Sequence, residues 1–212
     1  MINIINFIKS FKNLLLYFLL ISILDLYLKN SVFSLLLTTF IIIIINKELF
    51  NKKIIDFKKN TKKYLILMIK YWLIGLTLML ISNTIINNIT NSIAINETLN
   101  RQQIYNSFIN SFIIMVLLNP ICEEIIYRGS FKTIFNNKTI YCIFTSLLFG
   151  LMHVIFNSDI IYMIPYALMG YYLAKTYYET DNIYTSIIMH IWHNLLMIIL
   201  IITGVMIWED LY

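Results

Sequence analysis

The sequence predicts an all-α protein, a polytopic bundle of about seven transmembrane helices. Of its 212 residues, 59% are hydrophobic and 13% are charged, whereas a soluble domain has about 25% charged residues. Five glycines and two prolines leave little turn chemistry for an all-β fold. Apolar runs of roughly 20 residues, the length that crosses a bilayer as a helix, recur along the chain.

Seven apolar segments are separated by polar breaks. We expect helices over 11–29, 31–46, 64–86, 106–132, 139–157, 160–178 and 183–207. The first follows lysines as a signal peptide would, but it is too long and no small-residue cleavage site follows, so we expect it to be retained. With no internal repeat, soluble segment or long linker, residues 1–212 are expected to form a single integral-membrane domain.

The charge distribution predicts how the chain is oriented. Seven of the 16 lysines and arginines lie between Lys47 and Lys63, and such a basic loop is typical of the cytoplasmic side. The Asn-rich stretch 87–103 is then expected outside, and Lys132 and Lys138 inside. Because the net charge of +5 comes from a loop between apolar segments, we expect a lipid bilayer as partner and no nucleic acid.

The composition also bears on the compartment. Heavy use of Ile, Asn and Lys is typical of a low-GC bacterial genome, so we expect a multi-pass protein of the bacterial plasma membrane.

The two cysteines, Cys122 and Cys142, lie in apolar stretches. Two cysteines form neither a disulfide framework nor a zinc ribbon, so they are expected to be small buried hydrophobic residues.

A few polar residues remain at membrane depth, where ionisable groups are functional candidates. They are Glu123, Glu124, Arg128, His153, His190, His193 and Asn194. Glu124 and Arg128 stand at i,i+4 with the acid first, the favourable order for a pair on one helix face. Glu123 points about 100° away, so it is expected to stay free and to act as a base in a restricted, partly dry cavity.

The histidines share the helical spacing of the glutamates. His190 and Asn194 stand at i,i+4, as do Phe149 and His153. At 1.5 Å per residue, Glu123, His153 and His190 lie roughly 14, 21 and 10 Å from the cytoplasmic helix ends, which is compatible with one layer. A single membrane histidine is usually a helix-to-helix hydrogen bond, but three beside two glutamates favour a site.

Two chemistries fit these residues. His and carboxylate ligands could hold a divalent metal such as zinc, although no H-E-x-x-H motif occurs. Without a metal, Glu123 and His153 would activate water while His190 and Asn194 stabilise an oxyanion. Pro120, one turn before Glu123, could kink the helix and admit water.

Three motifs in order, E-E-x-x-x-R at 123–128, F-x-x-x-H at 149–153 and H-x-x-x-N at 190–194, resemble the CPBP intramembrane protease family. That family includes CAAX prenyl proteases and bacterial Abi and bacteriocin-immunity proteins. The stretch YRGSF at 127–131 also fits, and the resemblance covers about 105–205. It implies Glu123 as water-activating base and Glu124 with Arg128 as its support. It further implies that His153 helps to activate water or binds a metal, and that His190 and Asn194 stabilise the oxyanion or complete a metal site.

The predicted function is an intramembrane endopeptidase, of metallo or glutamate type, that cleaves a peptide or lipidated protein at the membrane. The resemblance favours bacteriocin immunity or peptide maturation. A proton- or cation-coupled transporter is an alternative, although transporters usually show two corresponding halves. A second alternative is a non-catalytic immunity protein that binds a peptide. His193 lies outside the family pattern and shares a face with His190, which it could replace.

Overall fold

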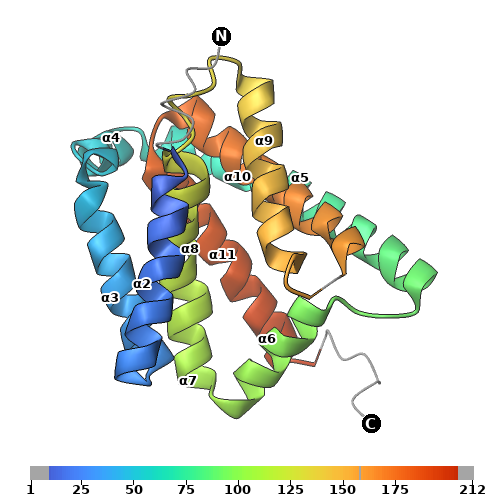
Figure 1. The fold of residues 1–212 in the computed structure, drawn as a ribbon. Helices are drawn as coiled ribbons and strands as arrows, with labels where there is room; N and C mark the ends of the chain where they lie inside the picture. The colour runs from blue at the N-terminus through green and yellow to red at the C-terminus, as the bar shows by residue number, and fades with distance from the viewer. Residues whose placement is uncertain (1–9, 158, 205–212) are drawn as a thin grey trace.

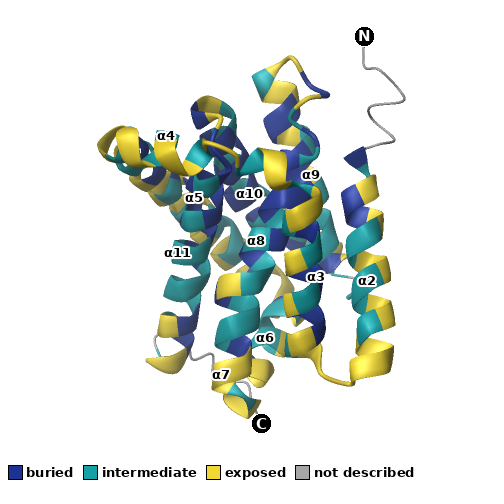
Figure 2. Cartoon of the chain, turned by 90° about the vertical axis from the view of Figure 1, so that its left-hand side faces the viewer, coloured by how far each residue is buried: buried dark blue, intermediate teal, exposed yellow. Residues whose placement is uncertain are grey.

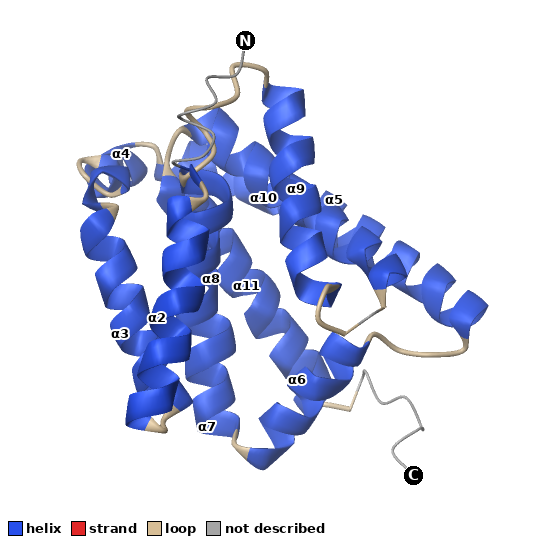
Figure 3. Cartoon of the chain, viewed as in Figure 1, coloured by secondary structure: helices blue, strands red, loops and turns tan. Residues whose placement is uncertain are grey.

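The structure is a computed structural model that describes residues 10–157 and 159–204. Within these residues every regular element is a helix and no strand is present (Figure 3). The predicted all-α fold is therefore confirmed. The first half of the chain contains, in order, α2 (Lys12–Leu28), α3 (Ser31–Ile45), the 3-10 turn η1 (Lys47–Leu49), α4 (Lys53–Lys59), α5 (Thr61–Thr90) and α6 (Ile95–Asn106).

The second half carries every predicted site residue. It contains α7 (Phe108–Ser111), η2 (Phe112–Leu118), α8 (Asn119–Glu123), η3 (Glu124–Gly129), α9 (Lys138–Val154), η4 (Ile160–Tyr162), α10 (Met163–Thr180) and α11 (Ile183–Ile202). α10 packs against α9 and α5, while α2 and α3 pair beside α8 (Figure 1). Two of the elements, η2 and η3, are π-helical and flank α8, so the glutamates lie in a helix whose turns are widened on both sides.

Asparagine side chains fix where three of the helices begin. Asn30, Asn137 and Asn182 each accept a hydrogen bond from a backbone N–H in the first turn of α3, α9 and α11. These N–H groups have no partner within the helix, and a side-chain cap supplies one. The polar breaks in the sequence therefore also act as helix start signals.

The expectation of seven membrane spans is not confirmed. Three stretches in the described residues are long and apolar enough to cross a membrane, namely Thr61–Thr90, Phe108–Gly129 and Ile183–Ile202. A fourth is counted if α3 and the Lys47–Lys59 segment, bent by 74°, form one broken span. α2, α3 and α9 have only 17, 15 and 17 residues, fewer than the roughly 20 that a straight span needs.

Two segments predicted as polar connections contain helices. The stretch 87–103 holds the end of α5 and most of α6, and the basic stretch 47–63 holds η1, α4 and the start of α5. In α6 an ion pair between Glu97 and Arg101 at i,i+4 supports the helix. The predicted segment 183–207 ends as a helix at Ile202, and its residues 205–207 lie outside the described part.

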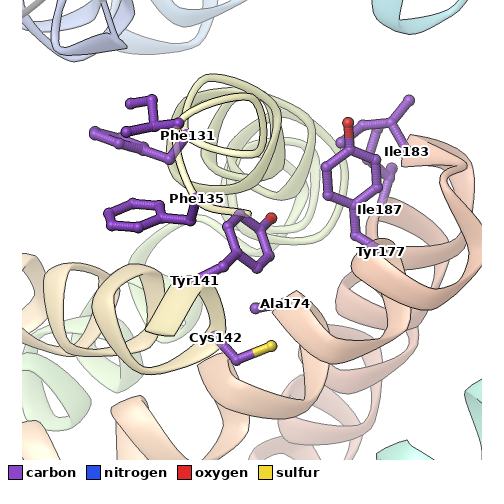
Figure 4. Close-up of a cluster of buried hydrophobic side chains, with 9 residues drawn as sticks. Phe131, Phe135, Tyr141, Cys142, Ala174, Tyr177, Ile183 and Ile187 are labelled. Atoms are coloured by element: carbon purple, nitrogen blue, oxygen red, sulfur yellow. The ribbon is translucent and has the colours of Figure 1, made fainter. Parts of the chain in front are cut away.

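The surface and the core fit a protein surrounded by lipid. Many large apolar side chains of α2 and α3 are exposed, among them Leu15, Leu26 and Phe40, and Figure 2 shows exposed residues along the outer faces of these helices. One buried cluster, drawn in Figure 4, joins the segment after η3 to α9, α10 and α11, and its members include Phe131, Tyr141, Ala174 and Ile183. Both cysteines are buried and unpaired, as predicted.

Polar contacts at the basic end tie α4 to the turn between α10 and α11. The Asp181 carboxylate pairs with Lys53 and Lys132, and the Asn182 side chain donates to Asp56 Oδ2 at 2.9 Å. Partial burial raises the pKa of Asp181, but the hydrogen bonds from the two lysines outweigh this effect and hold the pKa below its usual value. These contacts of Asp181 and Asn182 hold the start of α11, the helix that carries His190 and His193, against the basic segment.

Gly150 allows α9 and α10 to approach closely, and its replacement by alanine should separate them. A Cβ at position 150 would lie 2.6 Å from the Met163 carbonyl oxygen and 3.0 Å from the Ala167 nitrogen, both backbone atoms that cannot move alone. We expect Gly150→Ala to destabilise the fold by about 1–3 kcal/mol, measured as thermal unfolding in detergent. Gly75→Ala is the matched control, since its Cβ would meet only side chains, the nearest being Met169 Sδ at 3.1 Å. Equal losses in both variants would contradict the close-approach argument.

Candidate active site

A buried ion pair forms the base of the candidate site. Glu124 and Arg128, on successive turns of η3, have fully buried side chains, and Arg128 Nη1 lies 3.2 Å from Glu124 Oε1. Arg128 Nη2 also donates to the Gly170 carbonyl at 3.2 Å, and its guanidinium lies over the Phe149 ring at 4.4 Å. Two charges this deeply buried are tolerated only when each compensates the other. The predicted pairing of Glu124 with Arg128 is therefore observed.

His190 joins the ion pair to the second glutamate. Its Nδ1 lies 2.9 Å from Glu124 Oε1, and its Nε2 lies 3.7 Å from Glu123 Oε2. The Glu124 oxygen that faces the Arg128 guanidinium acts as an acceptor, so Nδ1 of His190 is the nitrogen that donates to it. The ring therefore presents Nε2 to Glu123 and to the cavity.

Glu123 differs from Glu124 in its surroundings. Its side chain is 18% exposed and lines a cavity of about 440 Å³, whereas Glu124 is completely buried. The sequence prediction that neighbouring glutamates would point to different faces therefore agrees with the structure. A carboxylate in a confined, partly apolar cavity is placed to act on a water molecule.

The third motif residue, His153, is held from two sides at the end of α9. Its Nδ1 lies 2.8 Å from the Phe149 carbonyl oxygen, and its ring stacks on Tyr166 with centroids 4.5 Å apart. Since a carbonyl only accepts, Nδ1 carries the proton and Nε2 remains as an acceptor. His153, Glu123 and His190 all line the same cavity.

Asn194 and His193 line the cavity one turn further along α11. The Asn194 side-chain amide donates one of its N–H groups to the Met115 carbonyl at 2.7 Å, which fixes the side chain against the π-helical η2 and leaves a second N–H. His193 is buried, and its Nδ1 has no hydrogen-bond partner in the described part of the chain. Only His190 of the two contacts the glutamates, so the structure favours His190 over His193.

The structure thus gathers the predicted residues of three helices at one cavity. Four of the six, Glu123, His153, His190 and Asn194, line it, and Glu124 with Arg128 lie directly behind. The predicted kink at Pro120 takes another form, because the chain continues as a helix and the irregularity lies in η2 and η3 on either side. A backbone bond from Ser130 N to the Ile125 carbonyl at 3.0 Å, five residues apart, is the π-type bond of η3.

Sequence reasoning missed residues that hold the site from α10. Tyr166 stacks on His153, and its hydroxyl accepts a hydrogen bond from the Asn96 side chain at 3.0 Å. At Gly170 a Cβ would lie 2.9 Å from Phe149 Cδ1 and 3.3 Å from Arg128 Nη2. A glycine in an otherwise apolar helix signals close packing, but nothing in the sequence assigns Tyr166 to His153.

The residues present do not fit a metal site in this arrangement. Among the described residues no three His, Cys, Asp or Glu side chains are grouped to hold an ion. His190 faces a carboxylate from each ring nitrogen, and His153 uses Nδ1 on a backbone carbonyl. We therefore derive no step through zinc or another divalent metal.

The apolar helical fold is that of a membrane protein, and its glutamates and histidines meet at one cavity. Residues 105–196 match the family described as Type II CAAX prenyl endopeptidase Rce1-like, and the resemblance to CPBP proteases that the three motifs predict is confirmed.

Curated relatives extend the likeness toward the N-terminus without adding a function. The chain is 28% identical over 162 residues to an uncharacterized protein of Mycoplasma capricolum subsp. capricolum, covering 70% of this chain and 47% of that protein. It is 29% identical over 110 residues to UPF0177 protein YbdI of Lactococcus lactis subsp. lactis, covering 49% of this chain and 59% of that protein. The chain thus spans about half the length of these relatives. No solved structure matches.

The buried ion pair yields a stability prediction. Arg128→Met should leave Glu124 uncompensated and cost about 3–5 kcal/mol, seen as a lower unfolding temperature in detergent. The double variant Glu124→Leu with Arg128→Met removes both charges, so it should recover most of the stability. If the double variant is as unstable as the single one, the uncompensated charge is not the cause of the loss.

Proposed function

We propose that the protein is a glutamate-type intramembrane endopeptidase that cleaves a peptide or lipidated protein in the plasma membrane of a bacterium. The observation that carries the proposal is the contrast between the two glutamates. Glu124 is completely buried and paired with Arg128, whereas Glu123 lines the cavity with its carboxylate near His190. The match of residues 105–196 to CAAX-type proteases supports the same reaction.

In the proposed reaction Glu123 takes a proton from a water molecule, and the water oxygen bonds to the carbon of the scissile carbonyl. His153 accepts a hydrogen bond from the same water through Nε2. The amide C–N bond then breaks, and Glu123 passes its proton to the leaving nitrogen. A carboxylate with little competing solvent is effective in both transfers.

The negative charge that develops on the carbonyl oxygen needs donors. Asn194 has one N–H free after its bond to Met115, and His190, held by Glu124 through Nδ1, donates through Nε2 when that nitrogen is protonated. Fixed donors aimed at the developing oxyanion are usually the largest catalytic contribution. Glu124 and Arg128 act in this scheme as positioning residues for His190.

Glu123→Gln should abolish cleavage while the protein stays folded in the membrane, because an amide cannot accept the proton. The measurement compares the membrane and secreted peptidomes of cells that express wild type, Glu123→Gln or the control Glu48→Gln at equal levels. Glu48 is exposed on the basic segment, so its variant should behave as wild type. Peptide termini that depend on Glu123 would also identify the substrate, and thereby distinguish bacteriocin immunity from peptide maturation.

Identical peptidomes from correctly inserted wild type and Glu123→Gln would contradict the proposal. If the Glu123→Gln variant also kept full biological effect, a non-catalytic peptide-binding immunity protein would replace it. A transporter would instead show Glu123-dependent proton or cation flux in vesicles.

Cleavage by the purified protein should survive extended treatment with a zinc chelator followed by its removal. The reason is that Nδ1 of each of the two motif histidines is bonded to a protein group, and no three His, Cys, Asp or Glu side chains in the described residues are grouped to hold an ion. Loss of activity that added Zn²⁺ restores would assign a metallo-type mechanism instead.

A further inference from the structure

We infer that the cavity opens on the outer side of the membrane and takes an uncharged polypeptide segment that arrives from that side. The inference rests on the proposed function, and three features carry it: where the charges lie, which ends of the helices line the cavity, and which polar groups line it.

The two ends of the molecule differ strongly in positive charge. The lysines of the 47–63 segment, with Lys12, Lys132 and Lys138, lie at the end where α2 and α9 begin, and where α4 contacts the turn between α10 and α11. At the opposite end, within the described residues, the basic residues are Lys29 and Arg101, and Arg101 is paired with Glu97. The basic end of a membrane protein faces the cytoplasm.

The cavity belongs to the other end. Much of its lining comes from the later part of α5 at 79–83, from residues 149–156 at and just beyond the end of α9, and from the later part of α11 at 190–201. Tyr17 and Phe18 of α2 and Ile126 and Tyr127 of η3 also line it. From α10, which runs toward the basic end, only the first turns at 165–169 contribute. No lining residue comes from the segments 47–63, 130–138 or 179–186.

Helix α6 borders the cavity at its outer end. Asn96, Glu97, Asn100 and Ile104 line it from this helix, and α6 lies at the end of the molecule opposite α4 (Figure 1). Asn96, Asn100 and the facing Asn83 of α5 are partly exposed. A path from this end therefore reaches the cavity without crossing the basic segment.

The lining identifies the class of substrate. Five asparagines from four elements, α5, α6, α8 and α11, line the cavity, and they are Asn83, Asn96, Asn100, Asn119 and Asn194. A carboxamide both donates and accepts, which suits the N–H and C=O groups of an extended peptide backbone. Methionines from five elements supply adaptable apolar surface, and they are Met79, Met115, Met152, Met169 and Met197.

Charge complementarity excludes other ligands. Besides the three histidines, the charged lining residues in the described chain are Glu97 and Glu123, so no lysine or arginine lines the cavity to receive a carboxylate or a phosphate. An uncharged, apolar stretch of a secreted or membrane-inserted polypeptide fits this lining better than an acidic peptide or a lipid headgroup.

The test is the access of a membrane-impermeant maleimide to single cysteines in intact cells. The native cysteines are buried, so the unmodified chain gives the background. We expect Asn100→Cys and Asn83→Cys to be labelled in intact cells, and Lys59→Cys on the basic segment to be labelled only after permeabilisation. Two cavity positions are used because either variant alone could fail to fold.

The opposite pattern, with position 59 labelled in intact cells and positions 83 and 100 only after permeabilisation, would overturn the inference. So would failure of both cavity positions to react in permeabilised cells, because the cavity would then be closed at this end. Labelling at position 100 should also cause loss of the Glu123-dependent peptide termini. The labelling pattern needs no activity, so it stands or fails separately from the proposed protease function.

Discussion

The buried pair of Glu124 and Arg128 is the constraint on which the rest of the site depends. A carboxylate with no exposed surface at membrane depth needs a compensating charge, and Arg128 provides it while also binding the Gly170 carbonyl. The pair thereby ties η3 to α10. Through Glu124 it also orients His190 on α11, so one ion pair sets the relative position of three elements.

This arrangement gives two adjacent residues of the same type different surroundings, since Glu124 is buried against Arg128 and Glu123 lines the cavity. Helical geometry rotates Glu123 away from Glu124 by about 100°, so one side chain enters the packed interior and the other enters the cavity. The widened turns of η2 and η3 lie next to this point. Such π-helical turns often occur at functional sites, and here η2 presents the carbonyl to which Asn194 binds.

Local spacing made much of the site predictable from the sequence. The i,i+4 spacing predicted the pairing of Glu124 with Arg128, because it depends only on the geometry of one helix. The order of the three motifs indicated the resemblance to the protease family. The support of His153 by Tyr166 was not predictable, because it depends on how α10 crosses α9. That crossing is set by Gly150 and Gly170, whose missing side chains allow contact at distances that a hydropathy pattern does not encode.

Composition predicted the all-α class correctly, but it did not predict the number of membrane spans. A hydropathy pattern gives the length of an apolar segment. It does not show the bend of 74° between α3 and the Lys47–Lys59 segment, or that the basic stretch contains the helix α4. Polar stretches were assigned to loops because they interrupt apolar runs. In α6, however, an ion pair one turn apart and the buried Ile104 stabilise a helix there.

The polar contacts between α4 and the turn at Asp181 and Asn182 have a further consequence for how the protein responds to salt. The Lys53–Asp181 pair is partly exposed to water, so it is screened by dissolved ions over distances near 10 Å at 0.1 M ionic strength. The Glu124–Arg128 pair has no exposed surface and is hardly affected by screening. Rising ionic strength therefore weakens the attachment of α4 while it leaves the buried ion pair intact, so the two ends of one helical bundle differ in their sensitivity to the medium.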